Sequence, residues 1–477
     1  MRHVLSPLVF AAFSLISASA VLGACSSDDA GVHGPTVPDR DAAATDGSPA
    51  VDEDGGTKAD SAGQPDAAKP DCSRAAQTPG APVSLYDAFV TDMAGITDPT
   101  ARSARAAKLV ADVKAAGGTP LESRGSAGVP GGDRVVFLAS GAPPNGTWNV
   151  GGSFRPGQPS WTANPLPLVQ VAGTDLYVAD TTIPRGAAHA YKLLSGTSDT
   201  GFREDPLASN VVWDGIDKKT VGNFNAVVHA SDAPMTQGRL VARHGVHAAA
   251  LANDRDVFVY LPPRYDDGSC AALPHLVIHD GNESLTRGDF AGVADATFAK
   301  TPAASAILVF VALTTQTARM DEYTFGTTGA LGDAYGKFLI DDLEPIVRAS
   351  YRVCSKAEDR GLSGASLGGL ISTYLAFQRP DVWGYVGAQS ASLFWDSDRM
   401  IARASEDPKV AVRFYLDHGC PNDNCVENQQ MNTALTQKGY DVTHVEVAGA
   451  QHDWAYWKAR LPQMLERFRS GRPSTCQ

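Results

Sequence analysis

The chain lacks the features that nucleic-acid-binding and zinc-binding proteins share. Lys and Arg number 40 against 53 Asp and Glu, so the formal charge is −13 at pH 7 and there is no excess of basic residues to attract nucleic acid. Only seven cysteines occur in 477 residues, and no two pairs of them stand at the spacing of zinc ligands. No internal repeat is present, so a solenoid or a propeller is not expected. We predict that the protein uses no metal or other cofactor and does not bind nucleic acid.

The first 24 residues have the pattern of a signal peptide. Arg2 is followed by an apolar stretch from Leu8 to Ala20, which is too short to span a membrane. Residues 22–25 read Leu-Gly-Ala-Cys, an order that resembles the bacterial lipobox, in which the cysteine becomes the lipidated first residue. We therefore predict a lipid on Cys25 that anchors the protein in the cell envelope, in the periplasm or at the outer membrane or cell surface. The alternative is an ordinary cleaved signal peptide.

Residues 25–71 are predicted to be a disordered tether. From Ser26 to Asp71 the sequence contains no aromatic residue and few apolar side chains to bury. Eleven acidic and three basic residues in this stretch account for −8 of the total charge of −13. The rest of the chain is thus only mildly acidic, and the tether is long enough to hold it clear of a membrane surface. The lipid is the only membrane contact that we expect.

Six cysteines remain when Cys25 is set aside, and an even number suits disulfides in an oxidising compartment. Cys420 and Cys425 stand close together in one predicted loop, and we predict a disulfide between them. The sequence leaves open the pairing of the others, which are Cys72, Cys270, Cys354 and Cys476.

Three folded segments follow the tether. Residues 72–132 are predicted to be helical, because 98–116 is a helical stretch with a proline in its first turn and glycines after its end. Residues 133–232 contain short β-prone runs between Gly-rich and Pro-rich turns, which predicts a small antiparallel β-sandwich. Residues 238–470 alternate apolar strands with long helices, which predicts an α/β domain with a mostly parallel sheet.

The strands expected in this α/β domain are almost continuously apolar, as in a sheet that helices cover on both faces. They are predicted at residues 257–261, 276–279, 306–313, 412–417 and 443–447, and the helices at 335–349, 367–378, 426–438 and 456–469. A shorter run at 360–363 is a further strand candidate.

A G-x-S-x-G pattern, Gly-Ala-Ser-Leu-Gly, occupies residues 364–368 between this short run and a predicted helix. In such a pattern the glycines permit a sharp turn that exposes the serine oxygen above the sheet. We therefore predict that Ser366 is a nucleophile, which needs a histidine nearby to take its proton. Three histidines follow it, and His452 lies in a Gly-containing loop directly after a predicted strand. We predict that His452 is the general base.

The acid that orients the histidine is expected between the serine and the histidine in the chain. Asp423 lies in the cysteine-flanked loop after the strand at 412–417, and we predict that it is this acid. Glu427 is the alternative, whereas Asp417 is expected to be a strand-end residue.

An oxyanion that forms on the substrate needs two backbone N–H donors. Leu367, directly after the nucleophile, is expected to supply the first. The second is expected from Gly281 or Asn282, in a turn that follows another predicted strand. All of these groups follow the carboxyl ends of predicted strands, where open α/β sheets place their sites.

Five segments of the C-terminal region carry further motifs. They are residues 255–265, 276–282, 364–369, 389–390 and 449–454, the last of which reads Gly-Ala-Gln-His-Asp-Trp. Together they resemble the enterochelin esterase and esterase D family over about 230 residues. The resemblance implies an α/β-hydrolase domain acting on acyl esters, in a family that includes siderophore, feruloyl and acetyl-xylan esterases and mycolyltransferases. The family's acid loop often reads Gly-x-x-Glu, whereas this chain has extra residues between Gly419 and Asp423.

The preceding region resembles the N-terminal domain of enterochelin esterases through residues 118–122, 191–192 and 205–206. Such domains resemble carbohydrate-binding modules, which makes a sugar-stacking platform one interpretation of three tryptophans and core packing the other. These are Trp148, Trp161 and Trp213.

The resemblance also implies residues that contact substrate. Arg319 stands in a segment that borders the active site of related esterases, where it would bind an acidic or catecholate substrate; a solvated loop with an internal ion pair is the alternative. Trp395, Trp454 and Trp457 are expected to be pocket walls, because their segments flank the predicted catalytic loops.

We expect a serine esterase that resembles enterochelin esterases and acts on a small-molecule or saccharide ester. A carbohydrate esterase of the feruloyl or acetyl-xylan type is the first alternative. A binding lipoprotein that retains a hydrolase scaffold without catalysis is the second.

Overall fold

The computed structural model describes residues 80–123, 132–154, 161–185, 188–215, 224–229, 237–473 and 476. The predicted signal peptide, Cys25 with its predicted lipid, the predicted tether and Cys72 all lie outside the described residues. The chain divides into two units, Met1–Ala67 and Ala68–Gln477, and every described residue belongs to the second. Within this described part, no helix is both long and apolar enough to cross a membrane.

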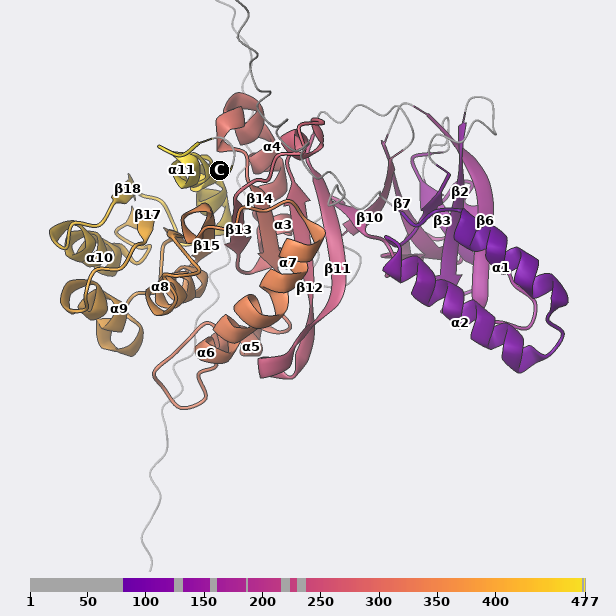
Figure 1. Ribbon diagram of the computed structural model, residues 1–477, viewed down its shortest axis with the longest axis horizontal. Coiled ribbons are helices and arrows are strands. Elements are labelled where there is room, and N and C mark those ends of the chain that lie inside the picture. The colour runs from indigo at the N-terminus through magenta and orange to yellow at the C-terminus, as the bar shows by residue number, and fades with distance from the viewer. Residues whose placement is uncertain are drawn as a thin grey trace, which may run out of the picture. The chain divides into compact units, whose positions relative to one another are not determined.

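The described residues form eleven α-helices and eighteen β-strands (Figure 1). The helices are α1 (Ser84–Gly95), α2 (Pro99–Ala115), α3 (Gly281–Thr286), α4 (Phe290–Lys300), α5 (Gln316–Glu322), α6 (Gly332–Lys337), α7 (Glu344–Ser350), α8 (Leu367–Gln378), α9 (Trp395–Glu406), α10 (Cys425–Gln437) and α11 (Trp454–Arg469). The N-terminal strands are β1 (Leu121–Glu122), β2 (Gly132–Ser140), β3 (Trp148–Gly152), β4 (Leu166–Pro167), β5 (Val169–Gln170), β6 (Leu176–Pro184), β7 (Ala188–Ser195), β8 (Phe202–Arg203), β9 (Asn210–Trp213) and β10 (Phe224–His229). The C-terminal strands are β11 (Arg239–Ala248), β12 (Asn253–Leu261), β13 (His275–Ile278), β14 (Ile307–Val311), β15 (Arg360–Ala365), β16 (Tyr385–Gln389), β17 (Arg413–Cys420) and β18 (Val442–Ala448).

The helix expected at 98–116 is α2. The side chain of Asp98 accepts a hydrogen bond from the Ala101 N–H, and a proline occupies the first helical position, where no N–H is needed. α1 and α2 pack their apolar side chains on one face of the antiparallel sheet β1-β2-β6-β5. The core that they share contains Phe89, Leu109, Val113, Val136 and Leu138.

The other N-terminal strands do not form a sheet of their own. β3, β4, β7, β8, β9 and β10 pair in antiparallel fashion, and their buried side chains share a core with the second face of β2. β9 is also hydrogen-bonded to β11, with Val211 opposite Leu240. The separate sandwich expected at 133–232 is therefore not confirmed, because these strands continue the 14-stranded sheet of the C-terminal region. Pairing with β9 satisfies the N–H and C=O groups that β11 would otherwise expose at its edge.

The C-terminal part of this sheet has the strand order β11-β12-β14-β13-β15-β16-β17-β18. β12 is antiparallel to β11 and β14, and the later strands are parallel to one another. The side chains of β12 alternate between two cores: Val257 and Val259 face one, and Phe258 and Tyr260 face the other. The prediction of apolar strands buried on both faces is confirmed for β12, β13, β14 and β17. It is wrong for the strand expected at 443–447, because this strand is the edge strand β18 and its side chains are partly or fully exposed.

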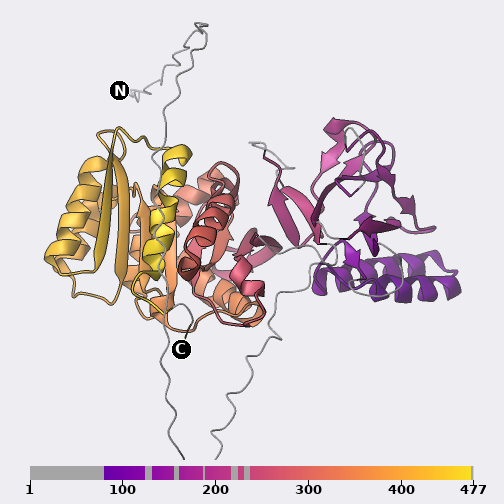
Figure 2. The same cartoon turned by 90° about the horizontal axis from the view of Figure 1, so that it is seen from above.

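Helices cover both faces of the C-terminal sheet. α6, α8, α9 and α10 contribute to one core cluster, and α4 and α11 contribute to the other. In Figure 1, α4 and α11 lie above β13 and β15, and α6, α8 and α9 lie below them. α4 and α11 pack against each other, as Figure 2 shows.

Several of the expected elements differ in extent from the prediction, two of them for an identifiable reason. The strand expected at 412–417 is β17, which continues through Cys420 because it pairs with β18 along that whole length. The helix expected at 335–349 is α6 and α7 joined by a π-helical segment, Phe338–Leu343. Pro345, in the first turn of α7, has no N–H to give to the preceding turn, which accounts for the local change of helix type.

Two disulfides are present among the described residues. One joins Cys354 to Cys476, and the other joins Cys420 to Cys425 as the sequence predicted. The second closes the short loop between β17 and α10, which is the loop that contains the expected catalytic acid.

Candidate active site

Ser366 occupies a sharp turn between β15 and α8. Its backbone has φ 59° and ψ −121°, a conformation that is strained for any residue with a side chain. A Cβ on Gly364 would lie 2.8 Å from the Cα of Gly368, so the chain can make this turn only with a glycine there. The Ser366 Oγ lies 3.2 Å from the Oγ of Ser392. This is the geometry that the G-x-S-x-G pattern predicts.

His452 lies in the loop between β18 and α11. The next residue, Asp453, caps α11 by accepting a hydrogen bond from the Ala455 N–H, which fixes the end of the loop. The imidazole meets the ring of Trp457 edge to face, with 5.0 Å between ring centroids. About a third of the His452 side chain is exposed, so one side of the ring is open to an incoming molecule.

Asp423 is fully buried and holds this imidazole. Its Oδ1 accepts a hydrogen bond of 2.8 Å from His452 Nδ1, and its Oδ2 accepts from Ser390 Oγ at 2.7 Å and from the Gly419 N–H at 2.6 Å. Burial raises the pKa of the Asp423 carboxyl, but these three donors outweigh it, and the pKa lies below its usual value. The geometry therefore favours Asp423 over Glu427 as the partner of the histidine.

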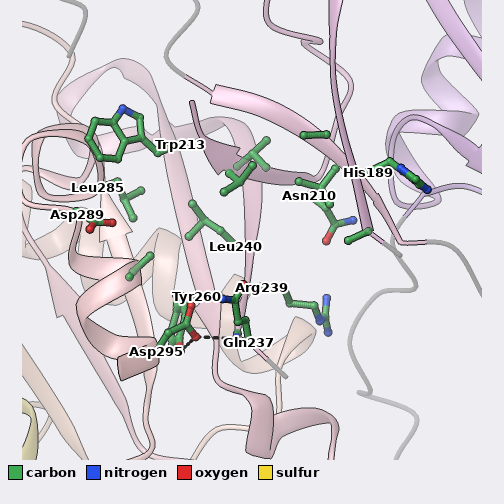
Figure 3. Close-up of a pocket in the computed structure, with 18 residues that line it drawn as sticks. His189, Asn210, Trp213, Gln237, Arg239, Leu240, Tyr260, Leu285, Asp289 and Asp295 are labelled. Carbon is green, nitrogen blue, oxygen red and sulfur yellow. Dashed lines mark hydrogen bonds between the residues drawn. The ribbon is translucent and has the colours of Figure 1, made fainter. Parts of the chain in front are cut away.

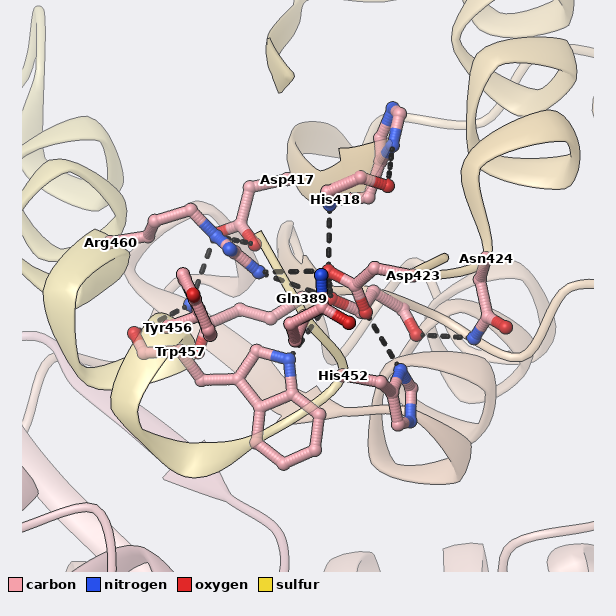
Figure 4. Close-up of polar contacts among 12 residues, drawn as sticks. Gln389, Asp417, His418, Asp423, Asn424, His452, Tyr456, Trp457 and Arg460 are labelled. Carbon is pink, nitrogen blue, oxygen red and sulfur yellow. Dashed lines mark hydrogen bonds and ion pairs between the residues drawn. The ribbon is translucent and has the colours of Figure 1, made fainter. Parts of the chain in front are cut away.

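A second set of polar side chains surrounds Asp423, and Figure 4 shows them together. Arg460 of α11 pairs with Asp417 of β17, with 2.6 Å between Nε and Oδ1. Gln389 donates to the other oxygen of Asp417 at 3.0 Å. Burial raises the pKa of Asp417 to about 6, although both partners lower it. Arg460 was not predicted from the sequence, and Asp417 was expected to be only a strand-end residue. The sequence did hold one signal for Arg460, because it shares a face of the predicted helix at 456–469 with Trp457.

The expected oxyanion donors begin two helices. Leu367 is the first residue of α8, and Gly281 and Asn282 are the first two of α3, so their N–H groups have no partner within their own helices. A Cβ on Gly281 would lie 2.7 Å from the backbone of Val311, so this close approach requires glycine. Asp280, which precedes it, has a left-handed φ of 56°.

Arg319 contacts this second turn. Its Nε and one terminal nitrogen donate to the two oxygens of Asp280 at 2.7 and 2.8 Å. Tyr323 fixes the same residue, because its hydroxyl accepts from the Asp280 N–H at 3.0 Å. The Arg319 guanidinium thus holds the turn that precedes Gly281, and a role in substrate binding stays a prediction.

The expected pocket walls lie in different surroundings. Trp395 is partly buried, and its Nε1 donates to the Phe325 carbonyl at 2.8 Å. Trp454 is buried between Phe290 and Trp457, with ring centroids 5.9 and 5.1 Å away. Trp457 is the only one of the three that the described contacts bring against His452.

The structure brings the three predicted catalytic residues to one edge of the sheet, but not all into direct contact. His452 and Asp423 are hydrogen-bonded, and the Ser392 N–H donates to the Ser366 carbonyl at 3.0 Å. Among the contacts of the described residues, no hydrogen bond joins Ser366 Oγ to His452. Such bonds are often long in the absence of substrate and tighten when it binds.

A pocket of about 420 Å3 is lined by other residues, which come mainly from β7, β9, β10, β11, β12, α3 and α4 (Figure 3). Trp213 lines it, and the hydroxyl of Tyr260 donates to Asp295 there at 2.8 Å. Trp148, another member of the possible sugar platform, is buried and donates from Nε1 to the Gly141 carbonyl. Core packing is thus the role of Trp148.

Residues 248–468, which include Ser366, Asp423 and His452, match the model of the Esterase family, described as "Putative esterase". The chain is 23% identical over 237 residues to the uncharacterized protein YbbA of Bacillus subtilis, covering 45% of this chain and 92% of that protein. It is also 25% identical over 148 residues to an endo-1,4-beta-xylanase/feruloyl esterase of Xylanibacter ruminicola, covering 31% of this chain and 19% of that longer protein.

Solved structures of esterases are similar to larger parts of the chain. The enterobactin esterase of Shigella flexneri is 17% identical, with 73% of this chain and 96% of that chain covered and a TM-score of 0.42. A ferulic acid esterase is 21% identical, with coverage of 49% and 98% and a TM-score of 0.42.

Replacement of Asp423 should lower the stability of the protein because it removes buried hydrogen bonds, and the size of the loss should depend on pH. We expect Asp423→Asn to lower the free energy of unfolding by about 1–3 kcal/mol at pH 7. Because the folded state depresses the pKa of Asp423, its contribution is present above the usual aspartate pKa and is lost as the pH falls through the depressed value. The difference from wild type should therefore shrink below about pH 4 in urea unfolding.

Glu427→Gln is the matched control, since it changes a carboxylate four residues away that has no contact with His452 among the described residues. A loss that does not vary with pH, or one that appears in Glu427→Gln instead, would contradict the assignment of Asp423.

Proposed function

We propose that the protein is a serine esterase that hydrolyses carboxylic esters through an acyl-enzyme on Ser366. The observation that carries the proposal is the hydrogen bond from His452 to the buried Asp423, beside a strained turn that presents Ser366. Membership of the esterase domain in a family of ester hydrolases supports it. The strand order, with a single antiparallel strand among parallel ones after β11, supports the α/β-hydrolase arrangement that the sequence predicted.

In the proposed reaction, Ser366 Oγ attacks the ester carbonyl carbon while His452 Nε2 takes the hydroxyl proton. Asp423 keeps Nδ1 protonated and stabilises the imidazolium that forms. The tetrahedral intermediate then expels the alcohol, which receives the proton from His452. Water attacks the acyl-enzyme in the same way, and the acid leaves as Ser366 regains its proton.

The negative charge on the former carbonyl oxygen needs fixed donors. We infer that the N–H of Leu367 supplies one and that of Gly281 or Asn282 supplies the other, because these groups begin helices and have no partner within them. The ion pair between Arg319 and Asp280 would then keep the second donor in place.

We infer that the substrate is a siderophore trilactone of the enterochelin type, as the motifs at residues 255–265 and 449–454 imply. A feruloyl or acetyl ester of a saccharide is the second candidate, favoured by the match to the Xylanibacter enzyme named a feruloyl esterase. The masses of the products released from enterochelin, feruloylated oligosaccharides and acetylated oligosaccharides would distinguish these substrates.

Loss of the nucleophile or of the base should abolish turnover. We expect Ser366→Ala and His452→Ala each to lower kcat/KM for a short-chain nitrophenyl ester by about a thousandfold or more. The double variant should lose no more activity than either single variant, because the two residues act as one unit. His444→Ala, on the neighbouring strand β18, is the control and should stay near wild type. Retention of a tenth of wild-type activity by Ser366→Ala would contradict the proposal. If the wild-type protein hydrolysed none of the esters tested, the alternative of a binding lipoprotein would be favoured.

We also propose that Cys25 is lipidated and anchors the protein in the cell envelope, on the motif at residues 22–25. Two acyl chains give stable membrane anchoring, whereas one gives only marginal binding. Cys25→Ser should leave the protein unprocessed or released in a membrane fractionation. Mass spectrometry that finds a mature N-terminus other than a lipid-modified Cys25 would contradict this proposal.

A further inference from the structure

Two buried carboxylates share one guanidinium behind the His452 imidazole. Asp417 and Asp423 are both fully buried, and Arg460 is 5% exposed. Arg460 Nε donates to Asp417 Oδ1 at 2.6 Å, and one of its terminal nitrogens lies 3.5 Å from Asp423 Oδ2. Figure 4 shows the guanidinium between the two acids. A buried ionised group is costly unless it is paired, so this arrangement ties the charge of one carboxylate to that of the other.

Ser390 connects the guanidinium to the acid that holds the histidine. Its hydroxyl donates to Asp423 Oδ2 at 2.7 Å and accepts from Arg460 at 3.1 Å and from Trp457 Nε1 at 3.0 Å. The Ser390 hydroxyl and the Arg460 guanidinium both lie on the Oδ2 side of Asp423. Oδ1 is thereby left for His452 Nδ1, which fixes the direction in which the carboxylate faces.

Burial raises the pKa of Asp417 to about 6, so above that pH both acids are ionised. The charge of the group then sums to −1, because one guanidinium faces two carboxylates. The other titratable groups near it are the phenols of Tyr385 and Tyr415, on β16 and β17, which interact with Asp417. Burial raises the pKa of both phenols, so they are neutral. Two further titratable groups, on His418 and Asp453, have other partners. His418 turns its Nε2 to His444 at 2.9 Å, and the Asp453 carboxylate caps α11.

We propose that Asp417 and Arg460 are positioning residues that together set the negative charge on which the protonation of His452 depends, acting through Asp423 and Ser390. This inference rests on the proposed esterase function. During acyl transfer the imidazolium forms beside a group of charge −1 and neutralises it. Removal of the Asp417 charge would leave Arg460 to neutralise Asp423, and the imidazolium would lose that stabilisation.

Loss of the Asp417 charge should change the pH dependence of turnover, and restoring the balance of charge should bring back the wild-type pH dependence. Asp417→Asn should move the acid limb of kcat/KM, which reports the imidazole of the free enzyme, to lower pH by about half a unit to one unit. Asp417→Asn combined with Arg460→Met removes one charge of each sign, so the limb should return to the wild-type position even if kcat stays low. A merely structural role would lower the rate without moving the limb and without restoration in the double variant.

A second buried pair of the same kind provides the control. Arg469, also on α11, pairs with the buried Asp359 at 3.0 Å. Asp359→Asn should lower stability without moving the acid limb, because this pair has no described contact with Asp423 or His452. Circular dichroism would establish that each variant is folded. If Asp417→Asn does not fold, the double variant still tests the proposal, since a displaced limb in that variant would overturn it.

The same shift should be visible without turnover. With histidine-selective 15N labelling, the His452 ring signals, assigned by their absence in His452→Gln, should titrate at lower pH in Asp417→Asn and at the wild-type pH in the double variant. An unmoved His452 titration in Asp417→Asn would overturn the inference. Turnover that survives in Ser366→Ala would overturn the esterase proposal instead, and the two failures are thus distinguishable.

Discussion

The hydrogen bond between His452 and the buried Asp423 is the constraint on which the rest of the site depends. The two residues come from different loops, one after β17 and one after β18, so the bond forms only if both strands end at the right place. Gly419 shows how close the loops lie, since a Cβ there would collide with the backbone of Ala450. The disulfide between Cys420 and Cys425 closes the acid loop on its other side.

A fully buried carboxylate also imposes requirements on its surroundings. Each of its oxygens must accept hydrogen bonds, since an unpaired buried charge would cost several kcal/mol. Asp423 meets this requirement with a side chain after β16, a backbone N–H of β17 and the imidazole itself. The acid is therefore held by three neighbouring segments of the sheet, which explains why it lies in the tightest part of the site while Ser366 and His452 remain partly open.

Local patterns allowed much of the site to be predicted from the sequence. The turn at Ser366, the helix that follows it, the pairing of Asp423 with His452 and the nearby disulfide all depend on residues close together in the chain or on a known order of elements. The network around Arg460 could not be predicted in this way. Its ion pair with Asp417 joins residues 43 positions apart and forms because α11 packs beside β17.

The N-terminal region shows the same limit at the level of the fold. Its antiparallel strands were predicted from alternation and turn residues, but alternation cannot tell which strand an edge will pair with. The pairing of β9 with β11, which joins these strands to the sheet of the C-terminal region, was therefore not predicted. Strand β16 escaped prediction because it is short and contains a glycine, although it supplies Ser390 directly after its end.

The central claim is that Ser366 is a nucleophile activated by the His452 and Asp423 pair, and covalent labelling tests it most directly. The protein would be treated with a fluorophosphonate, and the modified peptide identified by mass spectrometry. The account predicts a single phosphonyl adduct, on Ser366, which forms far more slowly when His452 is replaced. An adduct on another serine, or no adduct on the folded protein, would contradict it.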